Sequence, residues 1–213
     1  MKTDDLVAML ATGIAPVPRH TARRRIAQAL LMSLPVSLVI MLVRDGVRDD
    51  LLSAIFLPMF WAKLLFPLSI AAAALVAIHR LGRPGIGTGR TWMGLVLPVL
   101  AVWALALAHK LDMLPLAHAE PVPGVSWVRC MLSVGLISLP VLAATLLALR
   151  DLAPTRPAWS GAGAGALAGG VATAVFALHC KDLTPASLAL WQVASMLLPT
   201  LAGALLGRRL LRW

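Results

Sequence analysis

The chain has two cysteines, and both stand beside residues that complement thiol chemistry. Cys130 follows Arg129, and Cys180 lies within the run His179-Cys180-Lys181-Asp182. Two thiols can join in a disulfide, and two thiolates with an imidazole such as that of His179 can hold a soft metal ion. The wide spacing of the two cysteines fits no CxxC or zinc-finger pattern, and it does not decide between disulfide and metal. Either chemistry needs a fold that brings the thiols together.

The composition excludes a water-soluble enzyme and a disordered chain. Of the 213 residues, 60% are hydrophobic and 13% are charged, and the mean hydropathy is +0.86. A soluble domain carries about 25% charged residues. The apolar stretches hold no Asp, Glu or His well inside them, and enzyme chemistry needs such groups clustered at one depth. We therefore predict an all-α, polytopic membrane protein with no catalytic residue and no obligatory cofactor.

Six stretches are apolar and long enough to cross a bilayer, which takes about 20 residues per helix. They cover residues 26–43, 58–78, 92–108, 130–149, 159–178 and 186–206. We therefore predict two parts, a polar N-terminal segment over residues 1–25 and a transmembrane domain of six helices with short loops over residues 26–213. The apolar run 51–60, ahead of the second span, predicts a short interfacial helix.

Lysine and arginine are divided unequally between the two sides of these spans. The N-terminus, the second and fourth loops and the C-terminus together hold 13 of them. The opposite side holds five, which are Arg44, Arg48, Lys110, Arg129 and Lys181. Cationic segments stay in the cytoplasm, so both termini are predicted to be cytoplasmic. Cys130 and Cys180 then reach the same outer face from different spans.

Membrane topology also accounts for the net charge of +10. In a soluble protein that charge would indicate nucleic-acid binding, but here the cations mark the cytoplasmic loops. We predict the lipid bilayer as a partner and no direct contact with nucleic acid.

Lys63 is the clear charge inside a predicted span. An intramembrane charge is a functional hypothesis by default. Lys63 lies near the outer end of its span, from where its stem can snorkel to the interface or pair with an outer-loop acid such as Asp49. We expect one of these two arrangements rather than a role in transport.

Small residues recur at four-residue spacing in the fifth span. Gly161, Gly165 and Gly169 allow a second helix to approach closely, within the monomer or between subunits. Elsewhere, Ser-Leu-Pro-Val at 33–36 recurs at 138–141. This recurrence predicts a weak inverted repeat that relates the first three spans to the last three, although Leu-Pro pairs are common in membrane spans.

The N-terminal segment has the pattern of a short amphipathic helix followed by a basic anchor. Thr3 is a good N-cap, and Asp4 and Asp5 favour the positive end of a helix. An apolar stripe at three- and four-residue spacing follows, made of Leu6, Met9, Leu10 and Ile14. A helix of about ten residues is not stable alone in water, so the stripe needs a partner groove or a membrane surface. The basic run 20–25 is typical of a membrane anchor.

Several short motifs spread over the whole chain resemble the NrsF family. They are the opening Met-Lys-Thr-Asp-Asp-Leu, Arg-Pro-Gly at 83–85, Cys130, His179-Cys180, and the ending Leu-Gly-Arg-Arg-Leu at 206–210. The family comprises bacterial inner-membrane anti-sigma factors that hold an extracytoplasmic-function (ECF) sigma factor.

The resemblance implies roles for two sets of residues. It implies that the cytoplasmic N-terminal segment binds the sigma factor, through Thr3, Asp4, Asp5, Leu6, Met9, Leu10 and Ile14. It also implies that Cys130 and Cys180, facing the periplasm, sense metal or oxidative stress. The ligand is then a transition or heavy metal ion at Cys130, Cys180 and His179, or there is none and the product is a Cys130–Cys180 disulfide.

Two other function classes compete with a regulator. The first is a small-solute or metal transporter built on the inverted repeat, with Lys63 and the proline-containing spans near its pathway. The second is a membrane thiol oxidoreductase, which is less favoured because such relays present closely spaced cysteines. Uptake by proteoliposomes would separate a transporter from a regulator.

Overall fold

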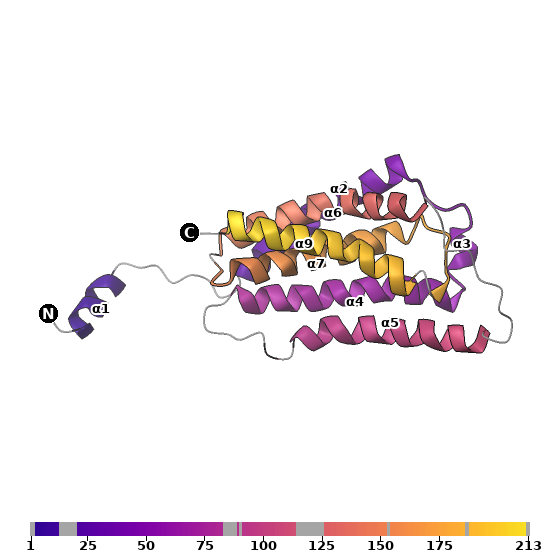
Figure 1. Ribbon diagram of the computed structural model, residues 1–213. Coiled ribbons are helices and arrows are strands. Elements are labelled where there is room, and N and C mark those ends of the chain that lie inside the picture. Colours follow the sequence, from indigo (N-terminus) through magenta and orange to yellow (C-terminus); the bar gives the residue numbers. More distant parts are fainter. Residues whose placement is uncertain are drawn as a thin grey trace.

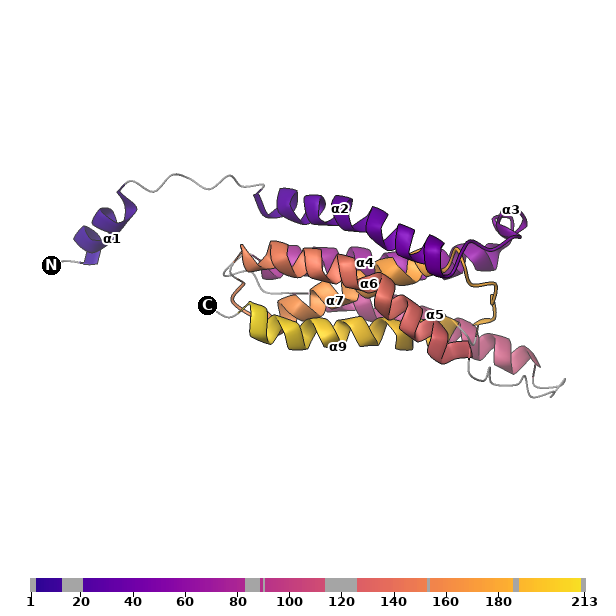
Figure 2. The same cartoon turned by 90° about the horizontal axis from the view of Figure 1, so that it is seen from above.

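Long helices laid side by side make up most of the structure, a computed structural model (Figures 1 and 2). It describes residues 3–12, 21–82, 89, 91–113, 126–152, 154–185 and 188–211. The helices are α1 (Thr3–Ala11), α2 (Thr21–Arg44), α3 (Leu51–Ala54), α4 (Pro58–Leu81), α5 (Thr91–Met113), α6 (Ser126–Arg150), α7 (Pro157–Phe176), the π-helix η2 (Leu188–Gln192) and α9 (Val193–Leu210). Those residues contain no strand, so the prediction of an all-α protein is confirmed for them.

Five segments are long and apolar enough to cross a membrane, judged by length and composition. They are Ala22–Arg44, Pro58–Leu81, Thr91–His109, Val128–Arg150 and Leu188–Leu210, and each overlaps a predicted span. The predicted span 159–178 is helical over most of its length, as α7, but it is not one of the five. Its many glycines add little hydropathy. Within the apolar run ahead of α4, the short helix α3 forms.

The helix α7 is the most enclosed part of the bundle. Fifteen of its 20 residues are buried, and α4, α6 and α9 pack around it. By contrast, α5 lies at the edge against α4 (Figure 1). A helix that meets other helices on most sides can use small residues where a lipid-facing helix needs large apolar ones.

Glycines bring the backbones of α7 and α9 into contact. A Cβ on Gly161 would lie 2.7 Å from the Cα of Gly207, and one on Gly165 would lie 2.6 Å from the Cα of Thr200. Gly169, further along the same stripe, also lies against α9. The stripe seen in the sequence therefore packs against another helix of the same chain.

An apolar cluster fills the end of the bundle where α6 begins and α7 ends. We call it the Phe176 cluster, and its members are Met41, Val134, Ile137, Ala172 and Phe176. Beside it, the buried hydroxyl of Ser37 on α2 donates a 2.9 Å hydrogen bond to the carbonyl oxygen of Ile137 on α6. The cluster supports the residues of the site described next.

Candidate functional site

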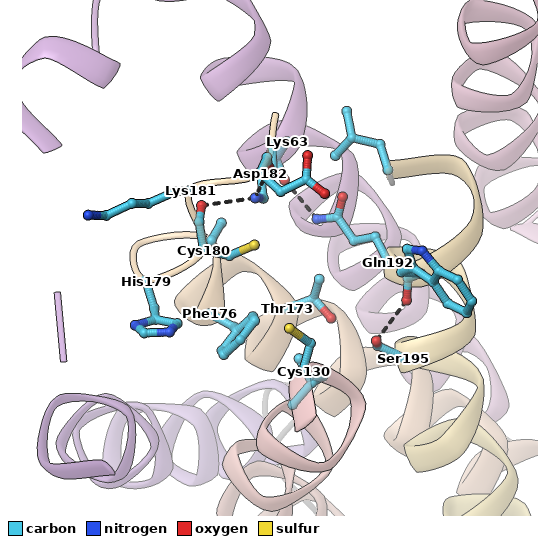
Figure 3. A pocket seen from close by; sticks show the side chains of 14 residues that line it. Lys63, Cys130, Thr173, Phe176, His179, Cys180, Lys181, Asp182, Gln192 and Ser195 are labelled. Atoms are coloured by element: carbon cyan, nitrogen blue, oxygen red, sulfur yellow. Dashed lines mark hydrogen bonds between the residues drawn. The ribbon is translucent and has the colours of Figure 1, made fainter. Parts of the chain in front are cut away.

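A cavity of about 360 Å³ opens beside the Phe176 cluster (Figure 3). The helix ends that line it lie at the end of the bundle far from the start of α2 (Figure 1). The lining of the cavity comes from α4, α6, α7, η2, α9 and the segment that follows α7. Among the lining residues are Lys63, Cys130, Thr173, Phe176, Cys180 and Gln192. The cavity therefore gathers residues from distant parts of the chain.

Both thiols line this cavity. Cys130 lies in the second turn of α6, and Cys180 follows the end of α7. Each is partly buried, neither is in a disulfide, and both pack against the Phe176 cluster. Figure 3 shows both sulfur atoms on the cavity side of their backbones. The structure thus brings together the two cysteines that the sequence singles out.

The surroundings of Cys180 favour its thiolate. The pKa of the Cys180 thiol is lowered from its ordinary value, chiefly by a hydrogen bond from the Cys130 thiol. The charge of Lys63, a hydrogen bond from its ammonium and a hydrogen bond from the backbone of Asp182 act in the same direction, while burial opposes them. Because the thiolate is the reactive form of cysteine, Cys180 is the better nucleophile of the pair.

His179 also lines the cavity, but its ring is held by contacts with Gly46 and Phe176. Its Nδ1 lies 3.0 Å from the carbonyl oxygen of Gly46, and its ring packs on Phe176 with the centroids 5.3 Å apart. Among the residues that the structure describes, no three His, Cys, Asp or Glu side chains gather as metal ligands. In this conformation the donors therefore amount to a thiol pair, and His179 does not complete a three-ligand site.

The loop after α2 closes over the segment that carries Cys180. The helix α2 ends at Arg44, and two residues later Gly46 has a φ of 77°, in the left-handed region that suits glycine. Beyond it, the backbone N–H of Arg48 donates to the carbonyl oxygen of Leu178 at 3.2 Å. The Arg48 side chain is buried and donates two hydrogen bonds to Asp50, at 2.8 and 2.7 Å. This contact holds the pKa of the Asp50 carboxyl at about 2, below its ordinary 3.8.

Lys63 is buried, and it does not pair with Asp49. It is only 6% exposed, and its ammonium donates to the carbonyl oxygens of Cys180, at 3.0 Å, and of Asp182. Asp49 pairs instead with Lys181, at 3.1 Å. These two backbone carbonyls satisfy donors of the buried ammonium inside the bundle.

The sequence reasoning missed Gln192. It ends the π-helix η2, is 8% exposed, and donates through Nε2 to the carbonyl oxygen of Lys63 at 2.9 Å. Its Oε1 is buried and has no hydrogen-bond partner among the described residues. The sequence does contain a signal that could have identified Gln192, because it is the lone side-chain amide within the last apolar run. Polar groups buried in spans are rare and costly. A π-turn is also frequent at functional sites.

The residues predicted to bind a partner at the N-terminus lie in or after α1. The side chains of Thr3, Asp4, Asp5, Leu6 and Met9 are exposed, with Leu6 at 41% and Met9 at 65%. Leu10 lies in the same helix, and Ile14 lies outside the described residues. The apolar side chains of Leu6 and Met9 are therefore uncovered in the isolated chain. The helix α1 stands apart from the bundle (Figure 2).

Comparisons with known proteins agree with the resemblance noted in the sequence. The model of the NrsF family, described as negative regulator of sigma F, matches residues 10–213. A probable anti-sigma-F factor NrsF of Azospira oryzae is 41% identical over 213 residues, covering all of both chains. The anti-sigma-F factor NrsF of Caulobacter vibrioides is 35% identical over 215 residues, again covering all of both. No solved structure matches the chain. On this agreement over the full length, the chain belongs to the NrsF family of negative regulators of sigma F, a regulatory and non-enzymatic family.

Proposed function

We propose that this chain holds an ECF-type sigma factor at the cytoplasmic face of the bacterial inner membrane and releases it when Cys130 and Cys180 react. In this proposal α7 is the sixth membrane span, both termini are cytoplasmic, and the thiols face the periplasm. The observation that carries the proposal is the position of the two thiols. They share one cavity at the end of the bundle far from α1.

Family membership supports a sigma factor as the partner, and the distribution of charge supports the proposed membrane orientation. The full-length relatives are anti-sigma-F factors by name, and the exposed apolar side chains of Leu6 and Met9 offer a helix-in-groove contact to a partner. The division of Lys and Arg favours cytoplasmic termini. With that orientation, the thiol cavity opens toward an oxidising compartment.

The chemistry we propose is thiol–disulfide exchange with a small disulfide. Cys180 attacks a sulfur of the small disulfide and displaces one thiol, and Cys130 then attacks the mixed disulfide on Cys180 and displaces the second. Two protein thiols and one small disulfide thus give one Cys130–Cys180 disulfide and two small thiols, so atoms and electrons balance. A soft metal ion bridging the two thiolates is the competing outcome, and the two products differ in mass.

The signal must change the relative stability of two arrangements of the helices. To go from about 99% holding to about 99% releasing requires about 5.5 kcal/mol of differential stabilisation. A covalent bond between α6 and the end of α7 acts on helices that also pack on one another. A shift of α7 caused by this bond can therefore alter the packing of α7 against α9. That contact runs along the bundle away from the cavity.

The experiment that tests this function compares cysteine variants for sigma-dependent transcription and for sigma retention at the membrane. Cys130→Ser and Cys180→Ser are each expected to abolish the response to oxidant, with basal retention largely intact. The double variant is expected to be no worse than either single one, because the two residues act as a unit. Met131→Leu, which removes the neighbouring sulfur on α6, serves as the matched control and should respond normally.

Two results would contradict the proposal. A double-serine variant that still responds fully would leave the cysteines as packing residues. If no sigma factor co-purified with the intact chain from detergent extracts, the proposal that the chain binds a sigma factor would be contradicted.

A further inference from the structure

The helix α4 buries one ammonium group beneath the Cys180 segment. Lys63 is 6% exposed, and moving an ammonium into an apolar environment is costly unless its donors are satisfied. Two of them meet the carbonyl oxygens of Cys180 and Asp182, as the dashed lines in Figure 3 show. Lys63 therefore clamps the backbone on both sides of Lys181.

Both peptide groups of Cys180 are held by this arrangement. Its N–H donates to the carbonyl oxygen of Phe176 at 3.1 Å, which ties it to the end of α7. Its own carbonyl oxygen accepts from Lys63 at 3.0 Å. With both peptide groups fixed, the Cα–Cβ bond of Cys180 has one direction, and that direction leads into the cavity (Figure 3).

Cys130 is placed in a different way. It lies within the regular helix α6, whose buried face packs on α2, α7 and α9. The segment after α7 is not part of such a helix, so its geometry depends on side-chain contacts to backbone groups. Of the two thiols, Cys180 is thus the one whose position depends on hydrogen bonds from other elements, and Lys63 provides the one to its own carbonyl oxygen.

The clamp is itself fixed to a third element. Gln192 Nε2 donates to the backbone carbonyl oxygen of Lys63 at 2.9 Å, which joins the π-turn η2 to α4. Lys63 therefore links the Cys180 segment to the start of α9.

We infer that Lys63 is a positioning residue for the thiol pair: its ammonium holds the backbone from Cys180 to Asp182 so that the Cys180 sulfur stays within reach of Cys130. This inference rests on the proposed thiol switch. Its effect falls on the second step of the exchange, in which Cys130 attacks the mixed disulfide on Cys180. Holding two reacting groups in place raises their effective concentration, so loss of the clamp slows ring closure and lets the mixed disulfide accumulate.

The test uses the full chain in lipid nanodiscs with oxidised glutathione as the oxidant. Samples are quenched over time, and intact mass distinguishes the glutathione adduct from the internal disulfide. The wild-type chain is expected to form the internal disulfide with only a trace of adduct. In Lys63→Met, ring closure is expected to slow by about tenfold or more, and the adduct on Cys180 to accumulate. Lys63→Arg can donate to both carbonyls and is expected to restore most of the rate.

Lys181→Met is the matched control. It removes a positive charge next to Cys180, but the Lys181 side chain is 60% exposed and pairs with Asp49 rather than with the cavity backbone. Ring closure is expected to be normal in this variant. If Lys181→Met slowed closure as much as Lys63→Met, local charge rather than position would be the cause, and the inference would be overturned.

Two further outcomes separate this inference from the proposed function. Ring closure at the wild-type rate in Lys63→Met would overturn the role of Lys63 and leave the thiol switch standing. A wild-type chain that forms no internal disulfide would overturn the redox switch, and the role of Lys63 with it. If Lys63→Met fails to fold, Lys63→Gln, a shorter neutral side chain that cannot span both carbonyls, carries the same expectation.

Discussion

Gly161 and Gly203 face each other across the α7–α9 contact so closely that a Cβ on either residue would overlap the carbonyl oxygen of the other. Both obstacles are backbone atoms, which cannot rotate away as a side chain can. The contact gains its stability from dispersion between two closely packed backbones. The contact therefore has no room for added side-chain volume at these two positions.

We predict that Gly161→Val lowers the free energy of unfolding by about 3 kcal/mol, at the upper end of what overpacking costs. The midpoint of thermal unfolding in detergent would report the loss. Gly135→Ala is the control, because a Cβ there would lie 3.7 Å from Cδ2 of Leu198, an ordinary contact, and only a small shift is expected. Equal midpoints for Gly161→Val and the wild type would mean that α7 and α9 separate at little cost.

The membrane orientation gives a second prediction, based on the 13 Lys and Arg residues on one side against five on the other. A reporter that works only in the periplasm should be inactive when fused after Trp213 and active when inserted near Glu120. The reason is that cationic segments are retained in the cytoplasm. The reverse pattern would invert the proposed sidedness of the thiols.

The N-terminal helix gives a third prediction. The double change Leu6→Asp and Leu10→Asp should release the sigma factor while the protein stays in the membrane. Loss of two apolar anchors at a helix-in-groove contact costs a few kcal/mol, or about a hundredfold in affinity. Co-purification from membranes measures it. Thr12→Asp adds a charge beyond the end of α1 and should retain the partner, whereas retention by the double variant would exclude α1 as the binding element.

A fourth prediction concerns acid stability at the loop that covers the thiol site. Asp50 has a pKa of about 2 in the folded chain against an ordinary 3.8, because Arg48 donates to its carboxylate. A lowered folded-state pKa stabilises the fold above the unfolded pKa, and this contribution disappears as the pH falls from about 4 to about 2. The unfolding midpoint of Asp50→Asn should therefore lie below that of the wild type at pH 5 and converge with it toward pH 2.

Asp49→Asn is the control for this titration. Asp49 belongs to the exposed pair with Lys181, its side chain being 94% exposed, and such pairs contribute little to stability. Its midpoint should follow that of the wild type throughout. If the difference in unfolding midpoint between Asp50→Asn and the wild type did not change with pH, the prediction would be contradicted. The stabilisation would then not come from the ionised Asp50 carboxylate that accepts from Arg48.

Hydropathy was enough to locate most of the helices, because a span is a property of consecutive residues. The prediction that Cys130 and Cys180 reach the same face came from counting the membrane spans between them. Such a count requires no knowledge of how the helices pack. Lys63 could not be placed in this way. Its partners are the carbonyls of residues 117 and 119 positions away, and backbone oxygens carry no signature in the sequence. Arg48 was counted as a loop cation, yet its side chain is buried against Asp50.

The enclosed position of α7 has a consequence for how the protein is made. A segment leaving the ribosome enters lipid in proportion to its own apolar side chains, and α7 offers mostly glycine and alanine. Its helical partner α9 is synthesised after it. If α7 is a membrane span, as we propose, it must therefore be sheltered by α4 and α6 or by the insertion machinery during translation, until α9 arrives to cover its glycine face. Chains truncated before α9 should consequently be poor membrane proteins and good substrates for quality-control proteolysis.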